Sequence, residues 1–267
     1  MNKRKKRKQK STKLLDGRIT EKNFMEAVID HENNQVRVYS NDMLLKRIQR
    51  DSIKIGKSFD KLCKEELIEI SKLFSKVAFL VSDGLIRAAH EENEMKVTCC
   101  KLLMNAISTV QAAIELLRIG YILQPGMMLR SVIETIGLVA YFLIEEEGYK
   151  KYQEGNFDSN KTIKYGKEVI PPLGHIHGFL SNHFVHISDL HSEINVVTLY
   201  KEMIDPLRIN LDTIKATIWS VYVASELVLY DYYDTHQYWT KIGENKYQFE
   251  QNEETKKWID KYFKVEE

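Results

Sequence analysis

The strongest constraint on the fold is a run of apolar residues, spaced three and four apart, that begins near Ser58. This spacing places apolar side chains on one face of an α-helix, and Asp83-Gly84 is expected to end that helix. The chain has only 12 Gly and 4 Pro in 267 residues, so few residues interrupt helices. The apolar positions of this first helix are Phe59, Leu62, Cys63, Leu67, Ile70, Leu73, Phe74, Val77 and Leu80.

Three further long helices are expected from the same spacing. One covers about residues 92–121, and the next covers about 127–147 after the turn Gln124-Pro125-Gly126. Pro206 is expected to open the last, at about 207–231, because proline suits the first turn of a helix. The helix at 127–147 is apolar almost all round, which predicts a place in the middle of a bundle.

These elements predict an all-α fold, an antiparallel bundle of four to five main helices. The bundle domain is expected at residues 56–240, preceded by an N-terminal extension at 14–55. Within the extension, QVRVYSND at 35–42 alternates apolar and polar residues, which indicates a short strand or hairpin arm.

The C-terminal segment, residues 241–267, is expected to include a short helix, EETKKWIDKYFK. Before it, the aromatic stretch DYYDTHQYW at 231–239 has two interpretations. It could stack bases, but such a cluster more often closes the end of a bundle.

Charge is distributed unevenly along the chain. Residues 1–13, MNKRKKRKQKSTK, carry eight Lys or Arg and no acid, and the rest of the chain has 31 basic against 38 acidic residues. We expect residues 1–13 to be a disordered basic arm on an acidic body. Such an arm either contacts the phosphates of RNA or is simply a solvated tail.

No apolar segment follows the basic start, so no secretory signal is expected. The most apolar segment, residues 126–144, contains Arg130 and Glu134, which favours a buried helix over a membrane span. The cysteines form no disulfide framework, so we expect a reduced, cytoplasmic setting and no membrane partner. They are Cys63, Cys99 and Cys100.

The stretch GHIHGFLSNHFVHISDLH, residues 174–191, holds five of the eight histidines. Ser181 is expected to cap a short helix in which Leu180, Phe184, Ile187 and Leu190 face the core. His186 would then lie at the core boundary beside Asn182 and Asp189. That position suits an acid or base, so His186 is the first candidate catalytic residue.

A metal site is a weaker interpretation of the same histidines. His183 and His186 are three apart on one helix, a usable ligand pair, but no HExxH motif or nearby cysteine supports them. We therefore expect no metal and no cofactor. A metal-dependent hydrolase that uses His183, His186 and Glu134 stays open as the third functional hypothesis.

Arg130 and Glu134 are one turn apart on the most apolar helix, where charges are costly unless they pair. The pair is expected either to lock the register of the bundle or to line a polar pocket between helices. Tyr141 lies two turns further on, almost in line. Glu115 would face Arg130 if the two helices pack antiparallel. All four are candidate binding residues, as is Ser181.

The two segments ELLRIGYILQPGMMLRSVIETIGLVAYFL and FLSNHFVH resemble a family of uncharacterised bacterial helical proteins. The shared pattern is Leu-x-x-Gly, then Leu-Arg-Ser-x-x-Glu, then Leu-Ser-x-x-x-x-His, and it covers roughly residues 95–190. The matching residues here are Leu117, Gly120, Leu129, Arg130, Ser131, Glu134, Leu180, Ser181 and His186.

That family is similar to the HEPN superfamily of helical bundles, which includes metal-independent ribonucleases and toxins as well as non-catalytic members. The resemblance implies a HEPN-like bundle in which His186 is catalytic. The nuclease signature of that superfamily is an Arg followed by a polar residue and a His. Ser181 stands here in place of that Arg. A serine cannot stabilise phosphorane-like charge, so Arg130 would have to supply the guanidinium from another helix.

The first functional hypothesis is therefore a HEPN-like protein that binds or cleaves RNA without a metal, in a bacterial defence or toxin context. His186 would be the acid or base, Asn182 a positioning group and Arg130 the phosphate contact. The alternative is a non-catalytic helical module that forms a homodimer or binds a partner or nucleotide. The acidic body favours the alternative, because proteins that grip RNA broadly present a basic face.

Overall fold

The structure is a computed structural model that describes residues 23–187, 191–192, 198–244, 246–250 and 253, with only the backbone of 159–160. The expected basic arm at 1–13 lies outside these residues. So does the expected helix at 253–264, apart from Glu253. The chain forms two compact units, Met1–Lys54 and Ile55–Glu267.

The first unit contains the strand pair that the alternation at residues 35–42 indicated. Strand β1 (Phe24–Asp30) pairs antiparallel with β2 (Gln35–Ser40). The turn between them places Asn34 at φ 51°, a left-handed conformation that asparagine tolerates. Two short helical elements follow, α2 (Met43–Lys46) and η1 (Arg47–Asp51).

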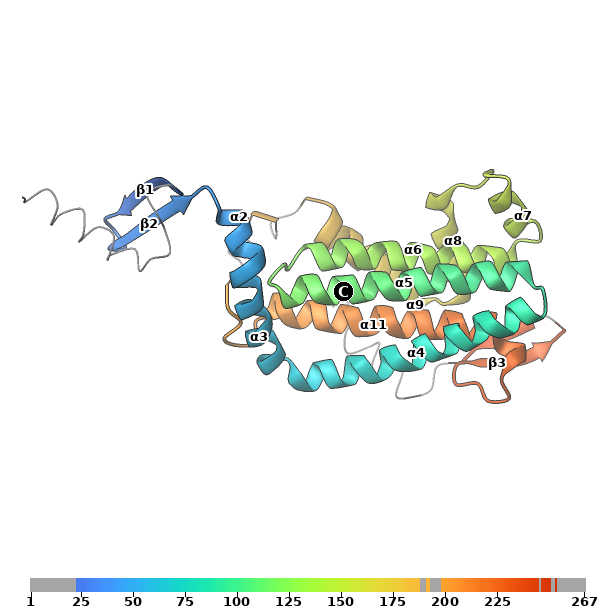
Figure 1. The fold of residues 1–267 in the computed structure, drawn as a ribbon. Coiled ribbons are helices and arrows are strands. Elements are labelled where there is room, and N and C mark those ends of the chain that lie inside the picture. Colours follow the sequence, from blue (N-terminus) through green and yellow to red (C-terminus); the bar gives the residue numbers. More distant parts are fainter. Residues whose placement is uncertain (1–22, 188–190, 193–197, 245, 251–252, 254–267) are drawn as a thin grey trace, which may run out of the picture. The chain divides into compact units, whose positions relative to one another are not determined.

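The second unit is the helical bundle. Helix α3 (Ser52–Leu62) leads into it, and the division between the units falls within α3. Helix α5 (Glu94–Arg118) packs against α4 (Lys64–His90), α6 (Gln124–Ile144) and α11 (Asp205–Val228). Figure 1 shows these four long helices side by side. The prediction of a mainly helical bundle is confirmed.

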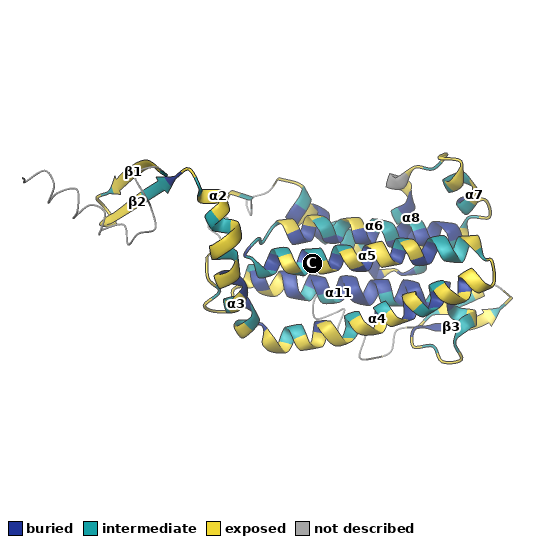
Figure 2. Cartoon of the chain, in the orientation of Figure 1, coloured by how far each residue is buried: buried dark blue, intermediate teal, exposed yellow. Residues whose placement is uncertain are grey.

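Burial follows the predicted apolar faces (Figure 2). Helices α6 and α11 are buried over most of their surface, whereas α4 presents one face to solvent. Among the described helices, α5 and α6 are long and apolar enough to cross a membrane, with mean hydropathies of 1.3 and 1.7. Core helices share that composition, and both pack inside the bundle here.

The predicted end of the first helix at Asp83-Gly84 is wrong. Helix α4 continues to His90, and Gly84 is buried inside it. A Cβ at Gly84 would lie 2.3 Å from Leu229 Cδ1. The glycine is therefore explained by close packing against a distant leucine, which a local turn signal cannot reveal.

Shorter helices cover one side of α6. They are α7 (Gly148–Gln153), α8 (Ser159–Val169) and α9 (Pro172–Leu180), followed by the π-helical turn η2 (Ser181–Val185). Helix α8 approaches α6 closely at Gly137, where a Cβ would lie 3.0 Å from the backbone of Ile163. This covering layer brings the histidine stretch onto α6.

The chain after α11 closes one end of the bundle. It forms η3 (Tyr230–Tyr232) and an antiparallel pair of strands, β3 (Trp239–Gly243) and β4 (Lys246–Phe249). Tyr238 and Trp239 belong to the hydrophobic core, which agrees with the bundle-closing interpretation of the aromatic stretch. The sequence pattern did not predict this second strand pair.

Candidate functional site

The histidine stretch is helical earlier than its sequence predicts. Helix α9 starts at Pro172 and runs directly into η2, so Ser181 lies in the middle of a helical segment. The predicted N-cap at Ser181 is wrong: its backbone is helical, and its buried hydroxyl donates to the His177 carbonyl at 2.7 Å. Leu173, Ile176 and Leu180 are buried, and this packing extends the helix through Ser181.

The chain leaves the helix at His186, which has extended backbone angles (φ −76°, ψ 137°) and an exposed side chain. The predicted core-facing stripe stops at Phe184, because Ile187 is 93% exposed. His186 is therefore not at a core boundary, and Asn182 is exposed as well. Asp189, its expected partner, lies outside the described residues.

The polar group that does assemble on this side of the bundle has Glu134 at its centre. Arg130 Nε donates to Glu134 Oε1 at 3.0 Å within α6, which confirms the predicted pair. His177 Nε2, from α9, lies 3.7 Å from the same carboxylate oxygen. We call these three residues the Arg130 cluster.

The Arg130 cluster is partly exposed rather than buried. The side chains of Arg130, Glu134 and His177 are 27%, 40% and 18% exposed. The pair is therefore not enclosed in the core, although it lies on the most apolar helix. Since both charges of the pair lie on one helix, the pair by itself cannot set the register between two helices.

The electrostatics of the cluster favour a neutral imidazole. Burial lowers the pKa of His177, and the positive charge of Arg130 lowers it further, while Glu134 acts in the opposite direction. A histidine with a lowered pKa is uncharged at neutral pH and can accept a proton.

The sequence did not single out His177. It shares no motif with Glu134, and the two meet only because α9 packs on α6. A signal was nevertheless present: His177 lies one residue after the buried Ile176, on the edge of an apolar helical face.

Two other predicted binding residues lie elsewhere. Tyr141 is buried against Tyr165 at a ring distance of 4.9 Å, and within the described residues no hydrogen bond or ion pair links it to the Arg130 cluster. Glu115 contacts Arg118 on its own helix, at 3.4 Å between Oε2 and Nη1, and no described contact joins it to Arg130.

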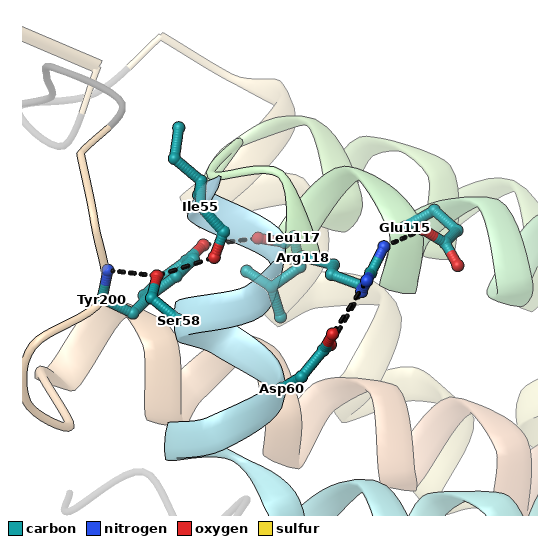
Figure 3. A network of polar contacts seen from close by, with 7 residues as sticks. All are labelled: Ile55, Ser58, Asp60, Glu115, Leu117, Arg118 and Tyr200. Atoms are coloured by element: carbon teal, nitrogen blue, oxygen red, sulfur yellow. Dashed lines mark hydrogen bonds and ion pairs between the residues drawn. The ribbon is translucent and has the colours of Figure 1, made fainter. Parts of the chain in front are cut away.

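Arg118 is the centre of a network that connects α3 to the end of α5 (Figure 3). Its Nε and Nη2 donate to the two carboxylate oxygens of Asp60 at 2.7 and 2.8 Å. Tyr200 donates its hydroxyl to the Leu117 carbonyl, and its backbone N–H donates to Ser58 Oγ at 3.0 Å. This network holds α3 and the loop at Tyr200 against α5.

The two arginines differ in how fully their guanidinium groups are used. Every nitrogen of the Arg118 guanidinium donates to a carboxylate. Arg130 uses only Nε, and within the described part of the chain its Nη1 and Nη2 have no hydrogen-bond acceptor. Of the five N–H donors of a guanidinium, Arg130 therefore keeps four free of an acceptor, with both Nη nitrogens open, whereas Arg118 keeps two, each on a nitrogen that already bonds a carboxylate.

The described residues do not support the metal site proposed for His183, His186 and Glu134. No group of three His, Cys, Asp or Glu side chains that could hold a metal ion occurs among the residues that the structure describes. His183 instead places its ring 4.5 Å from the ring of Phe179, and His186 is exposed.

No protein-family model, curated protein or solved structure matches this chain. Its function therefore has to be inferred from its own residues.

Proposed function

We propose that this protein is a HEPN-like helical bundle that binds RNA, with the Arg130 cluster as the contact for a phosphate group. One observation carries the proposal: the partly exposed Arg130 keeps Nη1 and Nη2 without an acceptor among the described residues. A guanidinium with two parallel free donors fits a phosphate in a bidentate way. Glu134 holds the guanidinium in place through Nε.

The distribution of charge along the chain predicts how RNA affinity is shared between the Arg130 cluster and the basic arm. Glu134 offsets part of the positive charge of Arg130, so a single contact at the cluster is weak. The eight basic residues of the arm at 1–13 supply additional, sequence-independent attraction to the RNA backbone. The arm gives affinity in this proposal, and the cluster positions one phosphate. We propose the bacterial cytoplasm, in a defence or toxin context, as the setting.

Metal-independent cleavage is a second candidate function, and the lowered pKa of His177 favours it. A neutral imidazole beside a phosphate-binding arginine can take the proton of a ribose 2′-hydroxyl. In this form of the proposal His177 replaces His186 as the base, because His177 belongs to the cluster and lies 3.7 Å from Glu134. Ser181 cannot take the role of the arginine that it replaces, because its hydroxyl carries no charge and donates to the His177 carbonyl.

The test is RNA affinity of the full chain in excess EDTA, measured by fluorescence polarisation with a mixed-sequence single strand. Arg130→Ala is expected to weaken binding about tenfold, the effect of losing a charge-assisted contact. Arg87→Ala is the matched control, because Arg87 also pairs with a carboxylate one turn away on its own helix, Asp83 at 2.7 Å. The control is expected to bind normally.

Equal affinity of wild type and Arg130→Ala would contradict the proposal and leave the arm as the only RNA contact. Cleavage is followed in the same samples. Cleavage that is lost in His177→Gln and kept in His186→Ala supports the second candidate. The reverse pattern would restore His186 as the catalytic residue. Binding without cleavage by wild type would support a binding module alone.

A further inference from the structure

A cavity of about 610 Å³ lies in the bundle, and the Arg130 cluster does not line it. Its volume falls within the range of small-molecule sites, roughly 300–1,000 Å³. It is surrounded by the first turn of α5, the last turn of α6, the end of α8 with Pro171, the end of α11 with η3, and the β3–β4 pair. Its lining residues that matter here are Lys96, Phe142, Ile144, Glu168, Asp231, Trp239, Tyr247 and Phe249.

The aromatic wall of this cavity is held firmly on α11. The buried Glu226 accepts the backbone N–H groups of Gln237 at 2.5 Å and Tyr238 at 2.9 Å. Trp239 Nε1 donates to the Val223 carbonyl at 2.9 Å. These bonds place the Trp239 side chain before any ligand arrives, so the wall is pre-formed and costs little ordering.

The cavity is lined by one basic residue, Lys96, and two acidic residues, Glu168 and Asp231. Lys96 is only 15% exposed, with its ammonium 3.6 Å from Asp231 and 4.2 Å from the centre of the Tyr232 ring. The Lys96–Asp231 pair is thus nearly neutral as a unit. Glu168 is exposed, and no ion pair engages it among the described residues. The lining therefore carries a net charge of about −1, held by Glu168.

We propose that this cavity binds a small organic amine with an apolar or aromatic body. Phe142, Trp239 and Phe249 would pack against the body, and Glu168 would pair with the protonated amino group. Aromatic walls add to the preference, because ring faces attract cations. A carboxylate ligand would meet Glu168 directly and would have to displace Asp231 to reach Lys96. This site is independent of the proposed RNA contact.

The test uses two probes with one body and opposite charge, phenylbutylamine and phenylbutyrate, titrated into the full chain by calorimetry. The amine is expected to bind about tenfold or more tightly than the carboxylate. Glu168→Lys is expected to reverse this preference. The matched control is Glu146→Lys, which makes the same charge change at an exposed residue that does not line the cavity.

A second variant tests the location independently of charge. Ile144 lines the cavity and is 42% exposed, so Ile144→Trp can introduce an indole there without disturbing the core. It is expected to weaken amine binding at least about tenfold. The proposal is overturned if wild type binds neither probe, or if it prefers the carboxylate. It is equally overturned if amine binding is unchanged in both Glu168→Lys and Ile144→Trp.

Discussion

Arg118 and Arg130 both pair with carboxylates, but Arg118 links two helices of the bundle, whereas Arg130 forms a candidate binding site. Arg118 bridges two helices and donates from all three guanidinium nitrogens. Arg130 pairs with a carboxylate of its own helix through one nitrogen and lies beside a histidine of a second helix. Their exposures are close, 36% and 27%.

The difference shows that exposure alone does not identify a functional arginine. The useful quantity is the number of donors that remain without an acceptor. A guanidinium that bonds a carboxylate through every nitrogen contributes to stability, and one with two nitrogens that have no acceptor can bind a ligand at little cost in stability. Each prediction below tests whether the two sites divide these roles.

The largest expected effect is on folding. Arg118→Ala should lower the free energy of unfolding by about 1–2 kcal/mol, because it removes a bidentate pair and the packing of the guanidinium over Gly56. Arg130→Ala should lower it by only about 0.5 kcal/mol, as expected for a pair within one helix. Urea unfolding followed by circular dichroism measures both. Equal losses in the two variants would remove the contrast.

The next largest effect is the loss of stability at acidic pH that the Arg118–Asp60 pair predicts. Hydrogen bonds from Arg118 lower the pKa of Asp60 below its ordinary value of 3.8. The stability that this pair contributes is therefore complete above that value and is lost as the pH falls through the lowered pKa. Asp60 is 41% exposed, so we expect less than about 1 kcal/mol.

Asp60→Asn should be less stable than wild type at about pH 7, and the gap should narrow as the pH falls below 3.8. Urea unfolding across this range measures the gap. A constant gap would mean that the Asp60 charge contributes nothing and that packing alone explains the loss.

The smallest expected effect is the loss of stability caused by protonation of His177, which occurs at a higher pH than that of Asp60. The pKa of His177 is lowered from 6.5, mainly by burial, so the unfolded chain takes up this proton more readily than the folded chain. Stability is therefore lost as the pH falls below about 6.5. His177→Gln should abolish this part of the loss, a difference below about 1 kcal/mol.

His175→Gln is the control, because His175 is exposed on the same helix. The temperature of unfolding, measured between about pH 7.5 and about pH 5.5, should respond to pH in this control as it does in wild type. A response to pH that is identical in His177→Gln and His175→Gln would exclude His177 as its source.

Local patterns predicted the four long helices and one contact of the site. The Arg130–Glu134 pair followed from a spacing of one turn, since helix geometry brings such residues together wherever the helix lies. The strand at residues 35–42 followed from alternation. Ser181 shows the limit of this reasoning. Its preference for a helix N-cap was overruled because the apolar residues before it already pack on α6.

The sequence by itself determined that this chain is mainly helical, that the apolar helix predicted at about 127–147 belongs in the middle of the bundle, and that Arg130 pairs with Glu134. Those properties depend on the order of residues within one helix. Only the tertiary structure decided that His177 joins the pair, that Arg118 bonds Asp60 of another helix, and that an aromatic-walled cavity contains Glu168. These outcomes depend on how separate helices pack, and no local periodicity encodes the partner that packing brings to a side chain.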